Sequence, residues 1–365
     1  MTIILFIIIL LVLIFVHELG HFLAAKSAKI KVHEFALGFS PKIWKKKKGE
    51  TEYSLGIIPF GGYVRIHGEN PEDVGEHDPD KDRALNHKPW YIQAWVLVAG
   101  VVFNIIFAWL LISVSFFSGY PTAVDEGNNL DVKDAHVVIV GVQANSPAEQ
   151  AGIKTGDIVL SITDGKNTVT AAQVDDVREF IYDSATGTPI ELHVMRKGEE
   201  KTISILPAEG IVEGKHAVGI SMNVVGVVTY GFFESLVKGA ETTYNVFVAT
   251  AQGLGGLIVD AVTGKAKLSS VSGPVGIAGM VGDARQFGFT YLLGFTALIS
   301  LNLAVINLIP FPALDGGRLL IVIIEAISRK KVPMKVQGWI NGIGFLILML
   351  LMILVTIGDV GKLLK

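Results

Sequence analysis

The sequence predicts a multi-pass α-helical membrane protein with four transmembrane segments, a membrane-associated β-hairpin region and one extracytoplasmic α+β domain. Half of the 365 residues are hydrophobic and the mean hydropathy is +0.51, which is high for a soluble protein and ordinary for a membrane protein with a water-exposed domain. Four apolar stretches are long enough to cross a bilayer, which takes about 20 helical residues. They are residues 1–25, 90–118, 289–328 and 338–358.

Charge and cysteine content limit the possible functions. The formal net charge of -3 gives no basic face, so nucleic acid is not an expected partner. The chain has no cysteine, so any extracytoplasmic part lacks disulfides. A metal site must therefore use histidines and carboxylates.

The first apolar stretch is expected to stay in the membrane as a helix. The alternative is a cleavable signal peptide, because residues 24–28 resemble a small-residue cleavage site. No positive charge precedes the apolar run, and the run is longer than a typical signal core. These two features favour a transmembrane helix.

Lysine and arginine residues in the loops predict the orientation. They follow the first apolar stretch, with a run of four lysines at residues 45–48, and they recur between the last two stretches at residues 329–335. Both loops should therefore be cytoplasmic. Both termini and residues 119–288 are then expected outside.

The cytoplasmic region at residues 26–89 is predicted to contain β-hairpins. Short runs of β-branched and aromatic residues are interrupted by Lys-Gly-Glu and by Gly61-Gly62. A cluster that includes Leu55, Ile57 and Ile58 is apolar enough to enter the membrane interface. The alternative is a small sheet that stays in the cytoplasm.

The extracytoplasmic domain is expected over residues 130–224. A strand, a turn at Ser146-Pro147, a short helix, and Gly156-Asp157 before a further strand resemble a bacterial-type PDZ domain. Such domains bind a peptide as an added strand, and residues 216–220 could form the backbone nest that holds a chain terminus. The alternative is a domain that serves only as a plug or spacer. Residues 225–288 are expected to form an amphipathic helix followed by a loop.

The segment HELGH places His17, Glu18 and His21 inside the first apolar stretch. On a helix, residues four apart lie on one face, which suits two imidazole ligands of one zinc ion. Glu18 lies about 100° away around the helix and can accept a proton without being a ligand. A catalytic zinc needs a third protein ligand and one open position.

Asp315 is the expected third ligand. It lies within an apolar stretch, and the prolines and glycines of residues 310–317 oppose a continuous helix there. The break would let the carboxylate reach the depth of the two histidines. The part after Gly317 is expected to be a separate helix near the cytoplasmic face.

The cost of polar groups in lipid favours a metal. An acidic residue at a helix centre costs about 2.5–3.5 kcal/mol, so Glu18 and Asp315 together cost about 5–7 kcal/mol. Zinc binding releases about 10–16 kcal/mol in small structural sites. Two alternatives remain: a metal or proton carrier that uses the same ligands, although no internal repeat supports it, and an inactive receptor that binds through its PDZ domain.

HELGH, the Gly100–Asn104 passage of the second stretch, one PDZ-like domain and the Asn307–Gly317 segment occur in the order typical of one family. Together they resemble the bacterial site-2 proteases, such as the regulator-of-sigma-E proteases, over nearly the whole chain. The resemblance implies a Zn²⁺ ion bound by His17, His21 and Asp315, with Glu18 as the acid/base.

The resemblance also implies residues that hold substrate. The family has a membrane-reentrant hairpin that presents substrate as an added strand, and residues 57–63, with Ile57, Gly61 and Gly62, are similar to it. Asn307 and Asn302 match positions proposed to hold the unwound substrate; the alternative is that these amides only link helices. Some members carry two PDZ domains, so the single one here departs from that pattern.

The implied activity is cleavage of the transmembrane segments of single-span membrane proteins in a bacterial cytoplasmic membrane. Anti-sigma factors and remnant signal peptides are the implied substrate types. A peptide or substrate segment at the PDZ domain and the lipid bilayer are the other expected partners.

Overall fold

The computed structural model describes residues 2–69, 74, 78–124, 132–185, 187–196, 198–212, 215–265 and 271–363. The chain divides into two compact units. The helical unit comprises Met1–Ser113, Leu236–Val281 and Gly294–Lys365, and the sheet unit comprises Val114–Ser235 and Gly282–Leu293. The predicted metal ligands all belong to the helical unit.

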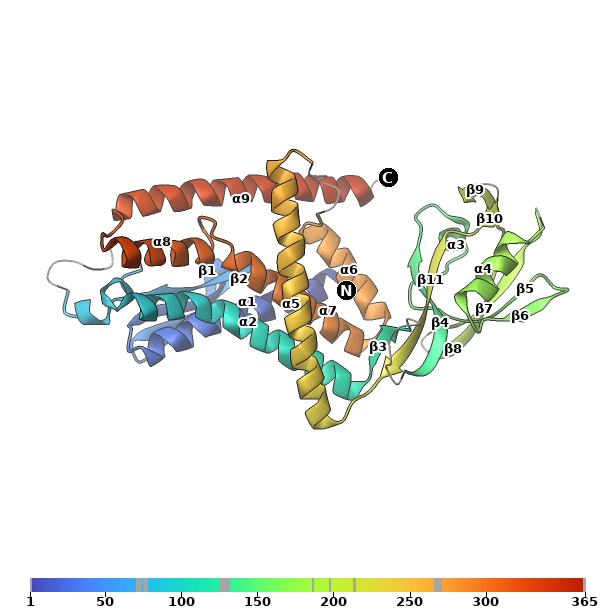
Figure 1. Ribbon diagram of the computed structural model, residues 1–365, viewed down its shortest axis with the longest axis horizontal. Helices are drawn as coiled ribbons and strands as arrows, with labels where there is room; N and C mark the ends of the chain where they lie inside the picture. Colours follow the sequence, from blue (N-terminus) through green and yellow to red (C-terminus); the bar gives the residue numbers. More distant parts are fainter. Residues whose placement is uncertain are drawn as a thin grey trace. The chain divides into compact units, whose positions relative to one another are not determined.

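Long apolar helices build most of the helical unit (Figure 1). Those that lie wholly or partly in it are α1 (Thr2–Ser27), α2 (Trp90–Ser118), α5 (Phe232–Val262), α6 (Pro274–Gln286), α7 (Phe289–Leu308), α8 (Asp315–Ser328) and α9 (Met334–Leu363), with two 3-10 turns at Lys81–Arg83 and Leu85–His87. Among the described helices, α1, α2, α5, α7 and α9 are long and apolar enough to cross a membrane. The bounds of α2 coincide with the predicted second span.

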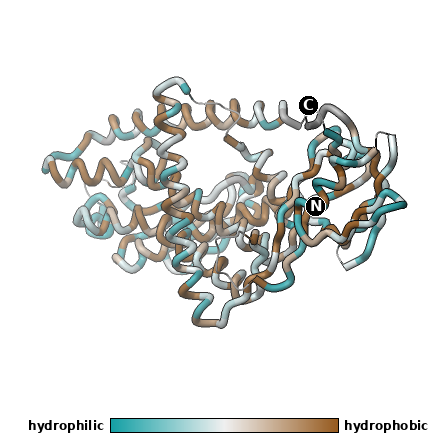
Figure 2. Tube along the Cα trace, turned by 45° about the vertical axis from the view of Figure 1, so that its right-hand side comes forward, coloured by the Kyte–Doolittle hydropathy of each residue, from teal (hydrophilic) through white to brown (hydrophobic). Residues whose placement is uncertain are grey.

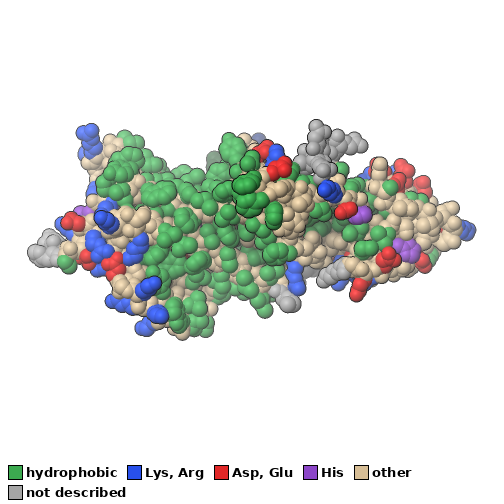
Figure 3. Space-filling model, turned by 90° about the horizontal axis from the view of Figure 1, so that it is seen from below, with side chains coloured by type: hydrophobic (Ala, Val, Ile, Leu, Met, Phe, Trp, Pro, Cys, Tyr) green, Lys and Arg blue, Asp and Glu red, His purple; other side chains and the backbone are tan. Residues whose placement is uncertain are grey.

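The outer surface of these helices is apolar. Phe345, Leu350 and Leu354 of α9 are each more than half exposed. Figure 2 shows hydrophobic residues along the helices, and Figure 3 shows hydrophobic side chains gathered over one broad face. Contiguous apolar patches on soluble monomers rarely exceed a few hundred Å². The protein is therefore a membrane protein whose helical unit faces lipid.

The third apolar stretch, predicted over residues 289–328 with a break before Asp315, forms two helices. Helix α7 ends at Leu308, and α8 begins at Asp315. Two prolines lie between them, and Ala313 adopts a left-handed conformation with φ of 72°. A proline removes a backbone donor and opposes the helical conformation of its predecessor, so the helix cannot continue. The 20 residues of α7 alone are enough for one crossing.

Helix α5 is longer than the amphipathic helix expected at the start of residues 225–288. It has 31 residues, and α6 follows in the segment expected to be a loop. In Figures 1 and 2, α5 runs across the direction of α2 and α9 instead of alongside them. By length α5 is a fifth candidate span, so the predicted count of four spans stays a prediction.

Residues 26–89 contain the antiparallel pair of β1 (Val32–Lys48) and β2 (Thr51–Ile66). Both strands bend back, so that Ala36 of β1 lies opposite both Ser54 and Tyr63 of β2. The end of β2 packs against α1, where Val64 is buried in one cluster with Ala24 and Ala25. This packing brings β2 beside the HELGH helix.

The sheet unit has one large antiparallel sheet. Its strands are β3 (Tyr120–Ala123), β4 (Lys133–Val142), β5 (Ile158–Thr163), β6 (Thr168–Thr170), β7 (Ile190–Arg196), β8 (Glu199–Ile205) and β11 (Ile220–Val228), in the order β3-β11-β4-β5-β7-β8 with β6 beside β5. Helices α3 (Pro147–Gln150) and α4 (Val174–Tyr182) and a hairpin of β9 (Ala208–Val212) and β10 (Lys215–Ala217) complete it.

The core of the sheet unit is apolar and continuous. Ile139, Ile162, Leu192 and Val177 are fully buried at its centre. The sheet exceeds the predicted domain of residues 130–224 at both ends, because β3 pairs with the last part of β11. Residues 130 and 131, where the domain is expected to begin, lie outside the described ranges.

Candidate metal centre

His17, His21 and Asp315 come together although the aspartate lies 298 residues beyond His17. One potential ligand atom of each lies within 4.8 Å of the other two. Asp315 Oδ2 lies 3.0 Å from His17 Nε2 and 3.3 Å from His21 Nε2, and the two Nε2 atoms are 3.2 Å apart. The histidines are 8% exposed. Three donor atoms of the types that zinc prefers therefore converge in a buried place.

The His21 ring is held in one tautomer. Its Nδ1–H donates a hydrogen bond of 2.8 Å to the backbone carbonyl of Val96 in α2. A neutral imidazole has one donor and one acceptor nitrogen, so Nε2 keeps its lone pair. That lone pair points to the place where His17 and Asp315 meet.

Two glycines shape the start of α8. A Cβ atom on Gly316 would overlap the backbone carbonyls of Leu308 and Ile309, and one on Gly317 would overlap that of Phe311. Only glycine lets α8 begin so close to the end of α7. As the first residue of α8, Asp315 lies at the positive end of the helix dipole, which favours a carboxylate.

Helices α1 and α2 also approach each other closely. A Cβ atom on Gly20 of α1 would overlap the carbonyl of Ala99 in α2. A Cβ atom on Gly100 would lie 2.7 Å from His17 Cε1 and even closer to the ring of His21. Glycine at these two positions therefore makes room for the imidazoles between the helices.

Glu18 lines the same small cavity as the three candidate ligands. The cavity measures about 170 Å³, and Tyr63 of β2 is among its other lining residues. Glu18 is not part of the ligand cluster. The arrangement fits a metal with three protein ligands and a carboxylate beside the open side.

The expected substrate-holding residues divide into two groups. The Asn307 Nδ2 atom lies 3.4 Å from His17 Nε2, and a Cβ on Gly62 would lie 3.3 Å from Glu18 Cγ, so both residues reach the centre. Asn302 instead donates to the Leu298 carbonyl of its own helix.

The other two expected residues have different surroundings. Ile57 is 58% exposed, and a Cβ atom on Gly61, whose φ is 143°, would overlap the Phe39 ring. Sequence patterns could not distinguish these two positions from Gly62, because the bend of β2 decides which part of the strand meets α1.

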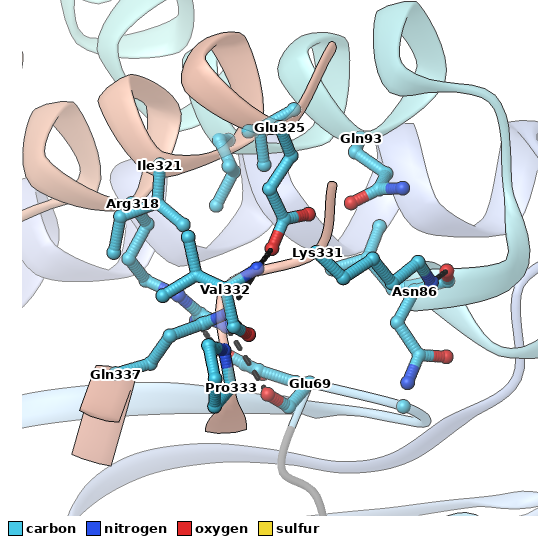
Figure 4. A pocket seen from close by; sticks show the side chains of 14 residues that line it. Glu69, Asn86, Gln93, Arg318, Ile321, Glu325, Lys331, Val332, Pro333 and Gln337 are labelled. Atoms are coloured by element: carbon cyan, nitrogen blue, oxygen red, sulfur yellow. Dashed lines mark hydrogen bonds and ion pairs between the residues drawn. The ribbon is translucent and has the colours of Figure 1, made fainter. Parts of the chain in front are cut away.

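Figure 4 shows the residues that line a second cavity, of about 280 Å³. The two cavities share Glu69, Leu85, Leu97 and Arg318 in their walls. Arg318 of α8 forms an ion pair with Glu69 and also donates to its backbone carbonyl. This pair was not predicted from the sequence. The only signal for Arg318 was its position three residues after Asp315, on the same face of a helix.

Outside the helices, the first turn of the hairpin is held by charge. Glu50 accepts a hydrogen bond of 2.7 Å from Lys26. Nη2 of Arg83 donates to both carboxylate oxygens of Glu50, also at 2.7 Å. The bond from Lys26, and to a lesser extent the bonds from Arg83, hold the pKa of the Glu50 carboxyl below its ordinary value. The contacts tie the hairpin to the end of α1.

Apolar helices that bring together two histidines and an aspartate beside a glutamate are typical of a membrane protein with a hydrolytic metal centre.

The comparison with known proteins identifies the family. Residues 5–351 match the family described as Peptidase family M50.

A candidate zinc metalloprotease of Clostridium perfringens is 38% identical, with 95% of each chain covered. Zinc metalloprotease RasP of Geobacillus kaustophilus is 30% identical, with 99% of this chain and 98% of the relative covered. The regulator of sigma-W protease RasP of Bacillus subtilis is 32% identical, with 99% of both covered. The chain belongs to Peptidase family M50, the site-2 proteases, and is a zinc metalloprotease.

Proposed function

We propose that the protein is an intramembrane protease that cleaves the transmembrane segments of single-span membrane proteins. The observation that carries the proposal is the meeting of His17, His21 and Asp315, two of them on a helix apolar enough to span a membrane. In this assignment the three side chains hold the zinc ion. Three protein ligands with one open position are typical of a catalytic zinc site.

Glu18 is the proposed acid/base. When bound, zinc polarises the scissile carbonyl and lowers the pKa of the attacking water to about 7. The Glu18 carboxylate takes a proton from that water and later gives it to the leaving amine. Its position in the wall of the same cavity supports this role.

Substrate must be unwound before it can be cut, because a helical peptide bond is shielded by its own hydrogen bonds. We assign the holding of the extended form to β2 and to Asn307. An extended segment can add to the edge of a sheet, where main-chain hydrogen bonds hold it. The closeness of Gly62 to Glu18 and of Asn307 to His17 supports these roles.

We propose that both termini and the sheet unit lie outside a bacterial cytoplasmic membrane, with the metal centre toward the cytoplasmic side. Lysines 45–48 of β1 belong on the cytoplasmic side by the positive-inside rule. The start of α1 and the end of α9 lie toward the same end of the helical unit, which supports an even number of crossings (Figure 1). In this topology α5 lies along the membrane surface.

The sheet unit is the proposed PDZ domain, and a peptide or substrate segment is its proposed ligand. A groove of about 470 Å³ runs between α4 and β11, lined by Val174, Ile181, Val218, Ile220 and Met222. Among the residues that the structure describes, β3 pairs only with Val225–Val228 of β11, which leaves the first half of β11 one edge toward the groove. An extended peptide can bind to such an edge.

Anti-sigma factors and remnant signal peptides are the proposed substrates. The Bacillus subtilis relative is named a regulator of sigma-W protease, which supports the first type. Membrane proteins that accumulate in a deletion strain would identify the substrates, and accumulation of neither type would reject this assignment.

The test compares wild type with Glu18→Gln on a purified single-span model substrate in detergent. We expect cleavage to fall by about 10²–10⁴-fold, the usual contribution of general acid–base catalysis. Zinc content should not change, because Glu18 is not a ligand in this assignment. Equal cleavage by both proteins would reject the mechanism. Transport of zinc or protons without cleavage would favour a carrier, and binding without either would favour an inactive receptor.

A further inference from the structure

One face of α2 lies against both histidines of α1. Val96, Gly100 and Asn104 are spaced four residues apart, so they follow one another along that face. The Val96 carbonyl accepts a hydrogen bond from His21, and Gly100 leaves room for both rings. Asn104 is the third member of the series and has no role in the mechanism described above.

Asn104 is completely buried against His17. Its side-chain Nδ2 lies 3.2 Å from His17 Nδ1, and its backbone carbonyl accepts a hydrogen bond of 2.9 Å from Ser300. The side-chain Oδ1 is also buried and has no hydrogen-bond partner among the residues that the structure describes. A buried carbonyl oxygen without a partner costs about 1–3 kcal/mol.

The chemistry of His17 offers this oxygen a partner. Nε2 of His17 faces Asp315 and His21, so it is the nitrogen directed at the metal. A neutral imidazole that offers Nε2 as a ligand carries its proton on Nδ1. Nδ1–H is then a donor, and it faces the amide nitrogen of Asn104, which is also a donor. The two ends of an amide are nearly identical in shape, so a half-turn exchanges them.

After that half-turn, Asn104 Oδ1 accepts a hydrogen bond from His17 Nδ1–H, and the orphaned oxygen gains a partner. We propose that Asn104 is a positioning residue that fixes His17 as the Nδ1–H tautomer and presents its Nε2 to zinc. Val96 does the same for His21 with a backbone carbonyl. One face of α2 thus orients both histidines, with Gly100 between the two acceptors.

This inference rests on the proposed assignment of His17 as a zinc ligand, and zinc affinity tests both. The apparent zinc dissociation constant is measured on the purified full chain by competition with a chromophoric chelator. Residues that orient a metal ligand typically contribute about 10–100-fold to affinity. Asn104→Leu keeps a similar volume but cannot accept a hydrogen bond, so we expect it to weaken zinc binding by about that factor.

Asn104→Asp separates an acceptor from a donor. A carboxylate can accept from Nδ1–H but cannot donate, so we expect zinc affinity to stay within about threefold of wild type or to increase. A loss of tenfold or more in this variant would overturn the inference, even if Asn104→Leu does not fold. Wild-type affinity in a folded Asn104→Leu protein would overturn it as well.

Two further variants complete the test. Ser300→Ala removes a buried hydroxyl that donates a hydrogen bond to the backbone carbonyl of Asn104, so it should bind zinc like wild type. A loss equal to that of Asn104→Leu would reduce Asn104 to a packing role and overturn the inference. His17→Ala should lose zinc. If His17→Ala binds zinc normally, the proposed ligand set fails; if it loses zinc while Asn104→Leu does not, only the positioning role fails.

Discussion

The helical unit and the sheet unit differ in the apolar side chains that they expose and in the polar side chains that they bury. Ile162 and Leu192 in the sheet unit are fully buried and surrounded by other aliphatic residues. In the helical unit, Leu350 of α9 is more than half exposed, while Asn104 and Ser300 are fully buried. The hydrophobic effect organises the first unit. In lipid that effect does not drive helices together, so close packing and polar contacts take its place.

Buried polar groups therefore mean different things in the two units. In the sheet unit, Asp157 is 1% exposed, but Arg196 binds both of its oxygens at 2.6 and 2.7 Å, and its carboxylate also accepts from the backbone of Lys154. That carboxylate is fully used in shaping a turn. In the helical unit, His17 and Asp315 direct their atoms at a common point. Buried polar groups that satisfy one another's hydrogen bonds have a structural role. Buried polar groups whose potential ligand atoms point at one common position indicate a bound ligand.

The largest expected effect tests this distinction by removing one buried aspartate from each unit. Asp315→Ala should lose zinc and cleavage together, because two imidazoles alone leave a catalytic site one ligand short. Zinc content by elemental analysis and cleavage of a single-span substrate measure the loss. Retention of one zinc per chain would contradict the ligand set.

Asp157→Ala is the matched variant in the sheet unit. It leaves the partly exposed Arg196 without its buried partner, and the lost charge-assisted hydrogen bonds cost about 1–3 kcal/mol. We expect easier proteolysis of the sheet unit with zinc content unchanged. Loss of zinc would mean that the two units do not divide structure from chemistry as described.

The second prediction compares two leucines. Leu192→Ala in the core of the sheet unit should lower the free energy of unfolding by about 2–5 kcal/mol, the usual cost of an emptied core position. Leu350→Ala, on the exposed surface of α9, should cost about 0.5 kcal/mol or less, like other surface substitutions. Unfolding of both variants in lipid nanodiscs by denaturant measures the difference. Equal losses would indicate that α9 is covered by protein.

The third prediction compares two glycines of the helical unit. Gly316→Ala forces a Cβ into the end of α7 and should cost about 1–3 kcal/mol while it moves Asp315 away from the histidines. We expect weaker zinc binding in the chelator assay. Gly342→Ala of α9 has open space within 4 Å and should bind zinc normally. Normal binding by both variants would show that the α7–α8 junction does not position the carboxylate.

The sequence predicted the helices and the metal centre more completely than it predicted the contacts around them. Polar residues stand out in an apolar stretch, so His17, His21 and Asp315 could be found without knowing their neighbours. The prolines before Asp315 also indicated a break. The exact ends of α7 and α8 depend on how Gly316 packs against the end of α7, which the local sequence pattern does not determine. The strands of the sheet unit could be expected from the turns between them, but the edge strand β3 could not, because its pairing joins distant segments.

The contacts that the sequence could not reveal are those between helices. Asn104 is an ordinary polar residue in a span until its distance to His17 is known. The pair of Glu69 and Arg318 joins segments far apart in the chain, and no spacing rule connects them. Such partners follow from how α1, α2 and α8 approach one another, which the order of residues along each helix does not determine.

The smallest expected effect concerns the Glu50 contacts, which lie at the water-exposed edge of the helical unit. Because Lys26 and Arg83 lower the Glu50 pKa in the folded state, the carboxylate stabilises the fold above the unfolded pKa, and this stabilisation is lost as pH falls through the folded value. At pH 7 the free energy of unfolding of wild type should exceed that of Glu50→Gln by about 1 kcal/mol. This is near the upper end of the contributions measured for surface ion pairs. The difference should shrink as pH falls from about 5 toward 3. Glu241→Gln, which removes an exposed pair with Lys238, is the control and should differ less from wild type at pH 7. A difference for Glu50→Gln that grows on acidification has the wrong sign and would mean that charge does not hold the hairpin against α1.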